Sequence, residues 1–304
     1  MPTRTRNRDV RGLLLLDKPG GLTSNRVLQR VKHLFQAAKA GHTGSLDPLA
    51  TGMLPICFGA ATSVCAYLLD ARKEYRVVAA LGAATDTGDA DGTVVATSDC
   101  QPPDRDTVAA ALERFEGTIE QIPPMYSALK QGGVRLYELA RRGVSVPRAA
   151  RSVVIERLRL EHYRWPELGL TVRCSKGTYV RTLVQDVAAA LGTLGYVREL
   201  RRLYVDPFAD EPMADLATLE ASAAEGGLAA LDRRLLPLDR ALPEWPAVPV
   251  SAAGAERLAH GQAVAAEPGW PLGRVRVYGP PGDLLALGEV GVDRRLVPLR
   301  VFGR

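Results

Sequence analysis

The stretch GHTGSLDPLATG runs from Gly41 to Gly52 and has neither the period of a helix nor that of a strand. Its one carboxylate, Asp47, stands directly before Pro48. Gly, Ser, Asp and Pro are all common in turns, so a surface turn is one interpretation. The other is a rigid loop that directs one carboxylate at a substrate, because Pro48 restricts Asp47 to extended backbone conformations. The rest of the chain has to decide between them.

The chain is large and basic enough to suggest a two-domain protein with an anionic partner. It has 304 residues, of which 46% are hydrophobic, and a formal net charge of +5. Most of the 39 basic residues are arginines, which suit bidentate phosphate contacts but also occur on solvated faces. The arginines gather in three clusters: Arg4, Arg6, Arg8 and Arg11; Arg135, Arg141, Arg142, Arg148 and Arg151; Arg198, Arg201 and Arg202.

Cysteines and histidines form no pattern typical of a metal site or a disulfide framework. The four cysteines include no CxxC pair and the four histidines are scattered, so we expect no metal and no other cofactor. No apolar run reaches the roughly 18 residues that a membrane helix needs. The first residues, MPTRTRNRDVRG, lack the apolar core of a signal peptide. We therefore expect a cytoplasmic protein that does not enter membranes.

The acidic turn TDTGDADG, residues 85–92, invites comparison with a calcium loop. The spacing does not fit, because such a loop needs a Glu at its twelfth position, and that position is Thr97 when counting starts at Asp86. We therefore interpret this segment as a turn.

Strands and helices alternate without a strict βαβ rhythm, which favours an α+β fold. We expect a largely antiparallel mixed sheet flanked by helices, and a small β-rich module after the Pro-rich segment 237–250. Tyr75, Val77, Ala79 and Leu81 alternate along one strand and should share a face. Strands are expected in 12–18, 73–82, 152–165 and 168–174, and helices after Thr23, after Thr62 or Ser63, in 104–117, in the segment that ends at Gly192, and twice within 215–240.

Several long motifs, in order along the chain, resemble those of the TruB family, the tRNA pseudouridine-55 synthases. They are GHTGSLDPLATGMLPICFGAATS, LLLLDKPGGLTSN, KEYRVVAALGAATDTGDADG, IPPMYSALKQGGVRLYELARRG, CSKGTYVRTLVQDVAAALG and YVRELRRL. The resemblance implies a catalytic domain in residues 1–245, with an RNA-gripping insertion at about 121–151, and a C-terminal PUA-type RNA-binding module in 249–304. One departure is the segment LRRLYVDPF, where relatives more often have Thr and Gly in place of Leu203 and Asp206.

The implied reaction breaks the N1–C1′ bond of a uridine in RNA, turns the uracil and joins its C5 to C1′. Glycosidases use two carboxylates, one of which protonates a leaving oxygen. A uracil anion is stabilised by its own carbonyl groups, so a single carboxylate suffices, and Asp47 is the candidate. Asp47 acts either as the nucleophile on C1′ or as the base for the C2′ proton; the sequence leaves both open.

A carboxylate in a dry pocket needs a cation to stay ionised, and the resemblance implies that Arg181 is this partner. It also implies that Tyr75 stacks on the uracil and relays the C5 proton. The remaining implied site residues contact the substrate or support the loop: Tyr179 and Leu200 line the pocket, His42 fills the space left by the extruded base, and Lys18 supports the loop or a phosphate.

The expected partner is tRNA, bound through its T-arm and T-loop, with the target base flipped out of its stack. We expect a monomer that works without a guide RNA. Three alternatives remain: an RNA-binding or tRNA-folding protein with the same grip, a glycosylase that releases free uracil, and a guide-dependent synthase of the dyskerin type.

Overall fold

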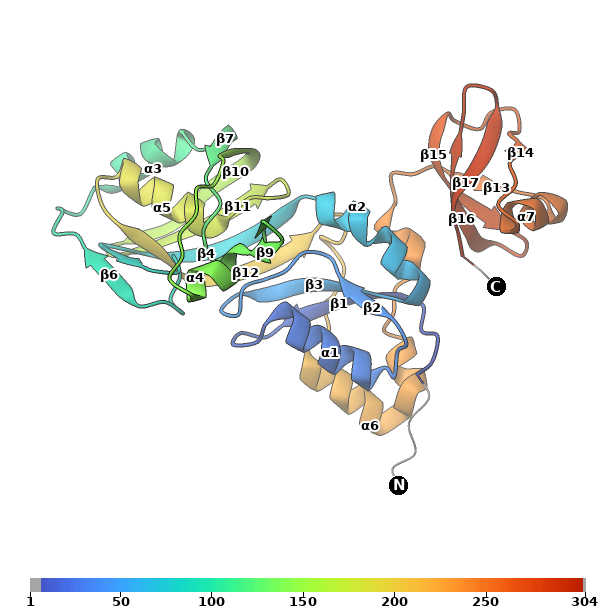
Figure 1. Cartoon of the computed structure of the whole chain (residues 1–304), viewed down its shortest axis with the longest axis horizontal. Helices are drawn as coiled ribbons and strands as arrows, with labels where there is room; N and C mark the ends of the chain where they lie inside the picture. The colour runs from blue at the N-terminus through green and yellow to red at the C-terminus, as the bar shows by residue number, and fades with distance from the viewer. Residues whose placement is uncertain (1–6, 303–304) are drawn as a thin grey trace.

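The structure, a computed structural model, describes residues 7–302 (Figure 1). It has the expected α+β fold: a large body is built on an eight-stranded sheet, and a smaller β-rich module lies at its C-terminal end. Arg4 and Arg6 of the first arginine cluster lie outside the described residues. Within residues 7–302, no helix has the length and apolar character needed to cross a membrane.

The helices and strands follow one another along the body and then the module. The strands of the body are β1 (Gly12–Lys18), β2 (Ala40–His42), β3 (Thr51–Phe58), β4 (Lys73–Leu81), β5 (Ala83–Thr85), β6 (Val94–Thr97), β7 (Gly117–Gln121), β8 (Lys130–Gln131), β9 (Val134–Arg135), β10 (Arg151–Arg164), β11 (Glu167–Cys174) and β12 (Gly195–Val205). Its helices are α1 (Ser24–Leu34), α2 (Cys65–Asp70), α3 (Arg105–Glu113), α4 (Leu136–Arg141), α5 (Val180–Ala190) and α6 (Leu216–Asp232), with the 3₁₀ helices η1 (Gly59–Val64) and η2 (Leu238–Ala241). The module contains β13 (Ala247–Pro249), α7 (Ala252–Ala259), β14 (Val264–Ala265), β15 (Gly273–Gly279), β16 (Asp283–Val290) and β17 (Arg295–Val301).

The large sheet has the strand order β1-β3-β12-β4-β11-β10-β7, and β2 pairs with β3. Among its described pairs only β3–β12 is parallel, so the sheet is mixed and largely antiparallel, as expected. The central strands β3 and β12 were not predicted. Residues 53–58 form a continuous apolar run, which period alone cannot assign to a strand, and β12 alternates poorly because charged residues stand on both of its faces.

The alternating apolar residues of β4 lie on the face of the sheet that packs against α3 and α5. Tyr75, Val77, Ala79 and Leu81 all belong to one buried cluster, which confirms the expected alternation. From the helices this cluster receives Val108, Leu112, Val180, Leu183, Val184 and Val187. The helix α5 ends before Gly192, whose φ of +71° suits a glycine, also as expected.

The other end of the sheet, β1 and β3, is covered on both faces. Helices α1 and α6 pack on one face, where Thr23 caps α1 through a hydrogen bond from the Arg26 N–H. On the other face lie η1 and α2. The expectation that Thr62 or Ser63 caps this second helix was wrong, because both hydroxyls donate back to carbonyls inside the 3₁₀ turn that begins at Gly59.

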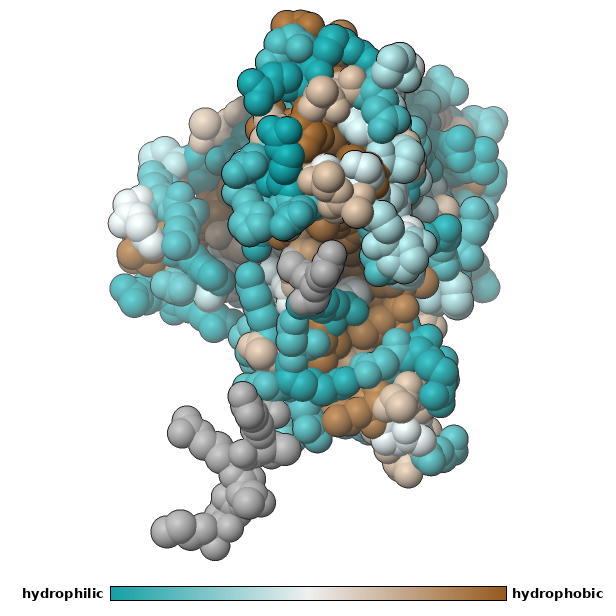
Figure 2. Space-filling model, turned by 90° about the vertical axis from the view of Figure 1, so that its right-hand side faces the viewer, coloured by the Kyte–Doolittle hydropathy of each residue, from teal (hydrophilic) through white to brown (hydrophobic). Residues whose placement is uncertain are grey.

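The C-terminal module is a curled five-stranded sheet, in the order β13-β15-β16-β17-β14, and resembles a PUA-type module. It has its own buried cluster, yet Leu287 and Phe302 belong to a cluster of the body. At the same junction the Arg274 guanidinium lies 5.5 Å from the ring centroids of both Tyr67 and Trp245. Seen from the module's side, hydrophilic residues cover most of the surface and apolar ones show between them (Figure 2).

Gly52 is required where β3 meets β12. Its φ is +98°, and a Cβ there would lie 2.1 Å from the Arg202 carbonyl oxygen. We expect Gly52→Ala to lower the free energy of unfolding by at least about 3 kcal/mol, because the clash adds to backbone strain. The control Gly21→Ala has a similar φ of +76° and open space around it, so it should lose only about 1–2 kcal/mol. Urea unfolding measures both, and equal losses would contradict the close approach.

Candidate active site

Asp47 lies in the loop between β2 and β3 and forms an ion pair with Arg181. The distance from Asp47 Oδ2 to Arg181 Nε is 3.0 Å. The Asp47 side chain keeps 40% of its surface open, whereas the Arg181 side chain is only 6% exposed. The structure thus brings together the two residues that the sequence suggested as a pair, with the cation buried and the carboxylate accessible.

Arg181 is held by three segments of the body. It stands in the first turn of α5, donates from Nη1 to the Thr87 carbonyl at 2.8 Å, and donates from Nη2 to the Tyr126 carbonyl at 2.7 Å. Nη1 also lies 3.6 Å from Asp89 Oδ2. A solvated arginine at a helix start would be free to move, but these contacts fix the guanidinium opposite Asp47.

Asp89 is the functional candidate that sequence reasoning missed. It is 5% exposed, and its Oδ1 accepts hydrogen bonds from the Thr87 hydroxyl at 2.6 Å and from the Asp91 N–H at 3.2 Å. In the sequence it is one of three acidic residues in a turn, and nothing there separates the buried one from its exposed neighbours. The sequence could have indicated a functional role for Asp89 only through its position in the TDTGDADG motif.

The surroundings make Asp47 a stronger base than an ordinary aspartate. Burial raises the pKa of its carboxyl group, and the Arg181 cation, the next largest influence, lowers it. The nearby Asp89 and Asp91 carboxylates raise the pKa further, and Lys18 opposes them. The site therefore holds a basic carboxylate in contact with a cation that stabilises its charged form.

Side chains from α1 and β1 fix the backbone of the Asp47 loop. The buried Ser24 hydroxyl accepts from the Leu46 N–H at 2.8 Å and donates to the Leu46 carbonyl at 3.0 Å. The Lys18 ammonium donates to the carbonyls of Pro19, Pro48 and Ala50 at 2.8, 3.2 and 2.6 Å. The loop is therefore a rigid support rather than a free surface turn.

Lys18 has no exposed surface, and burial lowers its pKa to about 8. Of its two expected roles, support of the loop fits this position. Direct contact with a substrate phosphate does not fit, because the ammonium faces three backbone carbonyls.

Tyr75 and Leu200 lie on β4 and β12, are each 8% exposed, and share a buried cluster with Leu46 and Ala50 of the loop. Burial raises the pKa of the Tyr75 hydroxyl, and the Arg202 cation beside it is the main opposing influence. Burial also raises the pKa of Tyr179, and the negative charge of Asp47 adds to the rise for both tyrosines.

His42 lies at the end of β2, where burial and then the Arg202 cation lower its pKa. Its Nδ1 atom is buried and has no hydrogen-bond partner among the described residues. Burial and the Arg202 cation thus favour the neutral imidazole, and no described residue holds its Nδ1 atom by a hydrogen bond.

The root of the insertion is tied to the same site. Gln121, which is 2% exposed, accepts from the Tyr179 N–H at 3.0 Å and donates to the Tyr179 carbonyl at 3.3 Å. Together with the Arg181–Tyr126 bond, this clamp connects the insertion to the residue before α5 and to the ion pair. The cationic tip of the insertion carries the short hairpin β8–β9 and α4, where Arg135 and Arg141 approach the Tyr137 ring.

The third arginine cluster does not form the phosphate-binding face that its sequence suggested. Arg198 pairs with Glu167 at 2.6 Å, Arg201 makes a bidentate pair with Asp17, and Arg202 is 1% exposed. Two of the three cations are therefore neutralised locally and the third is buried.

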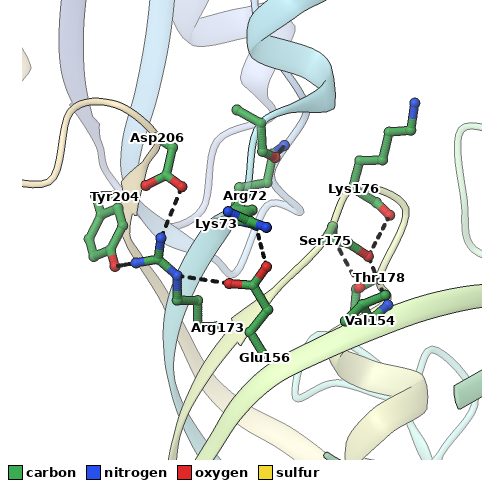
Figure 3. A network of polar contacts seen from close by, with 11 residues as sticks. Arg72, Lys73, Val154, Glu156, Arg173, Ser175, Lys176, Thr178, Tyr204 and Asp206 are labelled. Atoms are coloured by element: carbon green, nitrogen blue, oxygen red, sulfur yellow. Dashed lines mark hydrogen bonds and ion pairs between the residues drawn. The ribbon is translucent and has the colours of Figure 1, made fainter. Parts of the chain in front are cut away.

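Asp206, one of the two positions at which we expect a departure from the family, takes part in a network of polar contacts (Figure 3). Arg173 donates to Asp206 at 3.0 Å and to Glu156 at 3.1 Å, and it also contacts the Tyr204 hydroxyl. The Asp206 carboxylate thus ties the end of β12 to β11 through an ion pair with Arg173.

Within residues 7–302, no group of three or more His, Cys, Asp or Glu side chains is arranged to hold a metal ion.

Comparisons with known proteins identify the chain that carries this sheet, the Asp47–Arg181 pair and the buried Tyr75 as a pseudouridylate synthase. Three family models match in succession: the N-terminal domain of TruB family pseudouridylate synthases at residues 32–180, the tRNA pseudouridylate synthase B C-terminal domain at 181–243, and the C-terminal domain of pseudouridine synthase II TruB at 246–302. The chain belongs to the TruB family.

Relatives and solved structures match along nearly the whole length. The tRNA pseudouridine synthase B of Pseudomonas putida is 51% identical over 97% of this chain and 96% of its own, and that of Pseudomonas aeruginosa is 50% identical over 97% of each. A chain of an H/ACA RNP bound to a substrate RNA containing 2′-deoxyuridine has a TM-score of 0.72 at 23% identity, covering all of this chain and 88% of that one. A chain of a Cbf5-Nop10-Gar1 complex has a TM-score of 0.72 at 25% identity, covering all of this chain and 87% of that one.

Ser24 gives a direct test of how the loop is held. Ser24→Ala removes both the donor and the acceptor for Leu46, so the free energy of unfolding should fall by about 1–3 kcal/mol. The control Ser222→Ala removes a hydroxyl that donates to the Thr218 carbonyl within α6 and accepts from the exposed Arg234. Because these bonds lie near the surface, it should change stability by less than about 0.5 kcal/mol. Urea unfolding of the two variants measures the difference; a Ser24→Ala effect no larger than the control would show that the loop does not depend on this anchor.

Proposed function

We propose that this protein converts uridine to pseudouridine at position 55, in the T-loop of tRNA. The observation that carries the proposal is the accessible Asp47 carboxylate held 3.0 Å from the buried Arg181. The 50–51% identical relatives named tRNA pseudouridine synthase B support tRNA as the substrate. We further propose that the protein works in the cytoplasm as a monomer and needs no guide RNA.

In the proposed reaction the N1–C1′ bond breaks and the uracil leaves C1′ with the bonding electrons. The base then turns and C5 bonds to C1′, after which C5 loses its proton and N1 gains one. Asp47 either attacks C1′ or removes the C2′ proton; both start from the ionised carboxylate. No water enters the product, so a single carboxylate replaces the pair used in glycoside hydrolysis.

The other site residues receive roles from their positions around the pair. Arg181 keeps Asp47 ionised. Tyr75 stacks on the uracil and relays the C5 proton, and Tyr179 and Leu200 line the space for the base. His42, whose Nδ1 is unpartnered, fills the gap that the flipped base leaves in the RNA.

Binding of the RNA rests on cations outside the pocket. We assign residues 1–245 to the catalytic domain and 249–304 to the PUA-type module, with the insertion 121–151 as the RNA grip. Exposed Lys130, Arg141 and Arg142 lie in this insertion and suit phosphate contacts. The same grip would serve an RNA-binding or tRNA-folding protein, so the chemistry has to be tested separately from binding.

Asp47→Asn tests the chemistry, because it keeps the size of the side chain and removes its charge. The chemical step should slow by about 10²–10⁴-fold, whereas tRNA affinity should survive, since phosphate contacts and base stacking do not use this carboxylate. The measurement is single-turnover tritium release from C5-labelled uridine in a T-arm transcript, with tRNA affinity measured alongside. The control Asp91→Asn removes an exposed charge near the site and should stay nearly normal.

Arg181→Met should slow the same step strongly by leaving Asp47 without its cation. Because the two residues act as one unit, the double variant should be little worse than either single one. Near-normal tritium release by Asp47→Asn, or release of free uracil by the unaltered protein, would contradict the proposed function.

The salt dependence of tRNA binding tests whether the insertion 121–151 contacts the RNA phosphates. Affinity for tRNA should fall steeply with salt, because each neutralised phosphate releases counterions. Lys130→Gln and Arg142→Gln should each reduce the slope of log Kd against log salt by about 1, while Arg105→Gln at the start of α3 should leave it unchanged. Identical slopes for all three variants would place the RNA elsewhere.

A further inference from the structure

Arg202 is a fully buried arginine that has no carboxylate partner among the described residues. It is 1% exposed, and its guanidinium donates to the Met53 carbonyl from Nε at 2.6 Å and to the Gly44 carbonyl from Nη2 at 3.2 Å. The other buried arginine of the site, Arg181, faces two carboxylates. Burying an uncompensated charge is costly, so its presence needs a reason.

The two carbonyls that Arg202 binds lie on either side of Asp47. Gly44 precedes Asp47 in the loop, and Met53 follows it at the start of β3. A guanidinium is a planar fork with donors at fixed angles, so it sets the separation and direction of both ends of the loop at once. A single-point cation such as lysine cannot define both.

The backbone of Arg202 is fixed as firmly as its side chain. In the sheet, Arg202 pairs with Gly52 on β3 and with Tyr75 on β4. Gly52 permits this approach only because it lacks a Cβ. The Cα atom of Arg202 is therefore fixed between β3, which follows the loop, and β4, which carries Tyr75.

The buried charge of Arg202 also acts on its neighbours. The guanidinium lies beside the Tyr75 hydroxyl, where burial raises the pKa of Tyr75 and the Arg202 cation opposes that rise. Burial and then the same cation lower the pKa of His42. Burial lowers the pKa of Lys73, which is 7% exposed, and of Lys18, and the Arg202 cation lowers both further. Both lysines direct their ammonium groups at backbone carbonyls. The region behind the Asp47 loop is thus positive.

We propose that Arg202 is a positioning residue for the isomerisation: it holds both ends of the Asp47 loop and the Tyr75 hydroxyl in their reactive arrangement. This inference rests on the proposed function, because it assigns the geometry of the same site. The proposal adds Arg202 to the site residues, whereas the sequence suggested it only as one member of a surface arginine cluster.

The test compares Arg202→Met and Arg202→Lys with a matched control. Arg201→Met changes the preceding residue of β12, whose side chain pairs with the half-exposed Asp17 rather than with the loop. For each variant the measurements are single-turnover tritium release from C5-labelled uridine at saturating protein, tRNA affinity and thermal unfolding.

We expect Arg202→Met to slow tritium release by at least about 100-fold, as misplacement of a reactive group by about 1 Å does, with tRNA affinity changed less than about threefold. Arg202→Lys keeps the charge and loses the fork, so it should recover part of the rate and remain at least about 10-fold slow. Arg201→Met should stay within about threefold in both measurements.

A rate within threefold of normal in Arg202→Met would overturn the proposal. So would parallel losses of affinity and rate in both Arg202 variants, because these would indicate a general structural role. If Arg202→Met does not fold, Arg202→Lys decides: normal affinity with a slow step supports positioning, and a normal rate overturns it. Absence of tritium release from the unaltered protein would instead contradict the proposed function.

Discussion

Backbone groups of an irregular, partly buried loop need hydrogen-bond partners, and only a few backbone bonds, such as that from the Thr43 N–H to the Pro55 carbonyl of β3, supply them in the Asp47 loop. Side chains from three distant elements supply the others: Ser24 from α1, Lys18 from β1 and Arg202 from β12. The eight-stranded sheet brings these elements to one place, and the loop takes its shape from them. The position of the carboxylate is therefore a property of the whole body and not of the twelve loop residues.

The electrostatics of the site follow from the same arrangement. Arg181 faces both Asp47 and Asp89, so its positive charge is shared between the proposed reactive carboxylate and a second, buried one. Burial makes Asp47 more basic, while the cations behind the loop favour negative charge in front of it. A carboxylate that is both basic and ionised suits attack on a sugar carbon as well as removal of a sugar proton, which is why the geometry is compatible with either mechanism.

The sequence predicted those features that depend on local patterns or on residue types. The alternation in β4, the cap at Thr23 and the stop at Gly192 are all local, and Asp47 with Arg181 followed from chemistry and family resemblance. The strands β3 and β12 were missed because one is uniformly apolar and the other is charged on both faces. Arg202 looked like its neighbours Arg198 and Arg201, because pairing across the sheet, which buries it, leaves no mark in the sequence.

The junction between body and module limits how the two could be exchanged between proteins. Leu287 and Phe302 of the module complete a buried cluster of the body, and Arg274 stacks against Tyr67 and Trp245. A chimera joined at the Pro-rich segment would bring a foreign surface to this contact and leave apolar side chains of the body uncovered. The module therefore has its own sheet but shares a packed interface with the body. Moving it to another protein would require the contact residues on both sides of this interface to be moved as well.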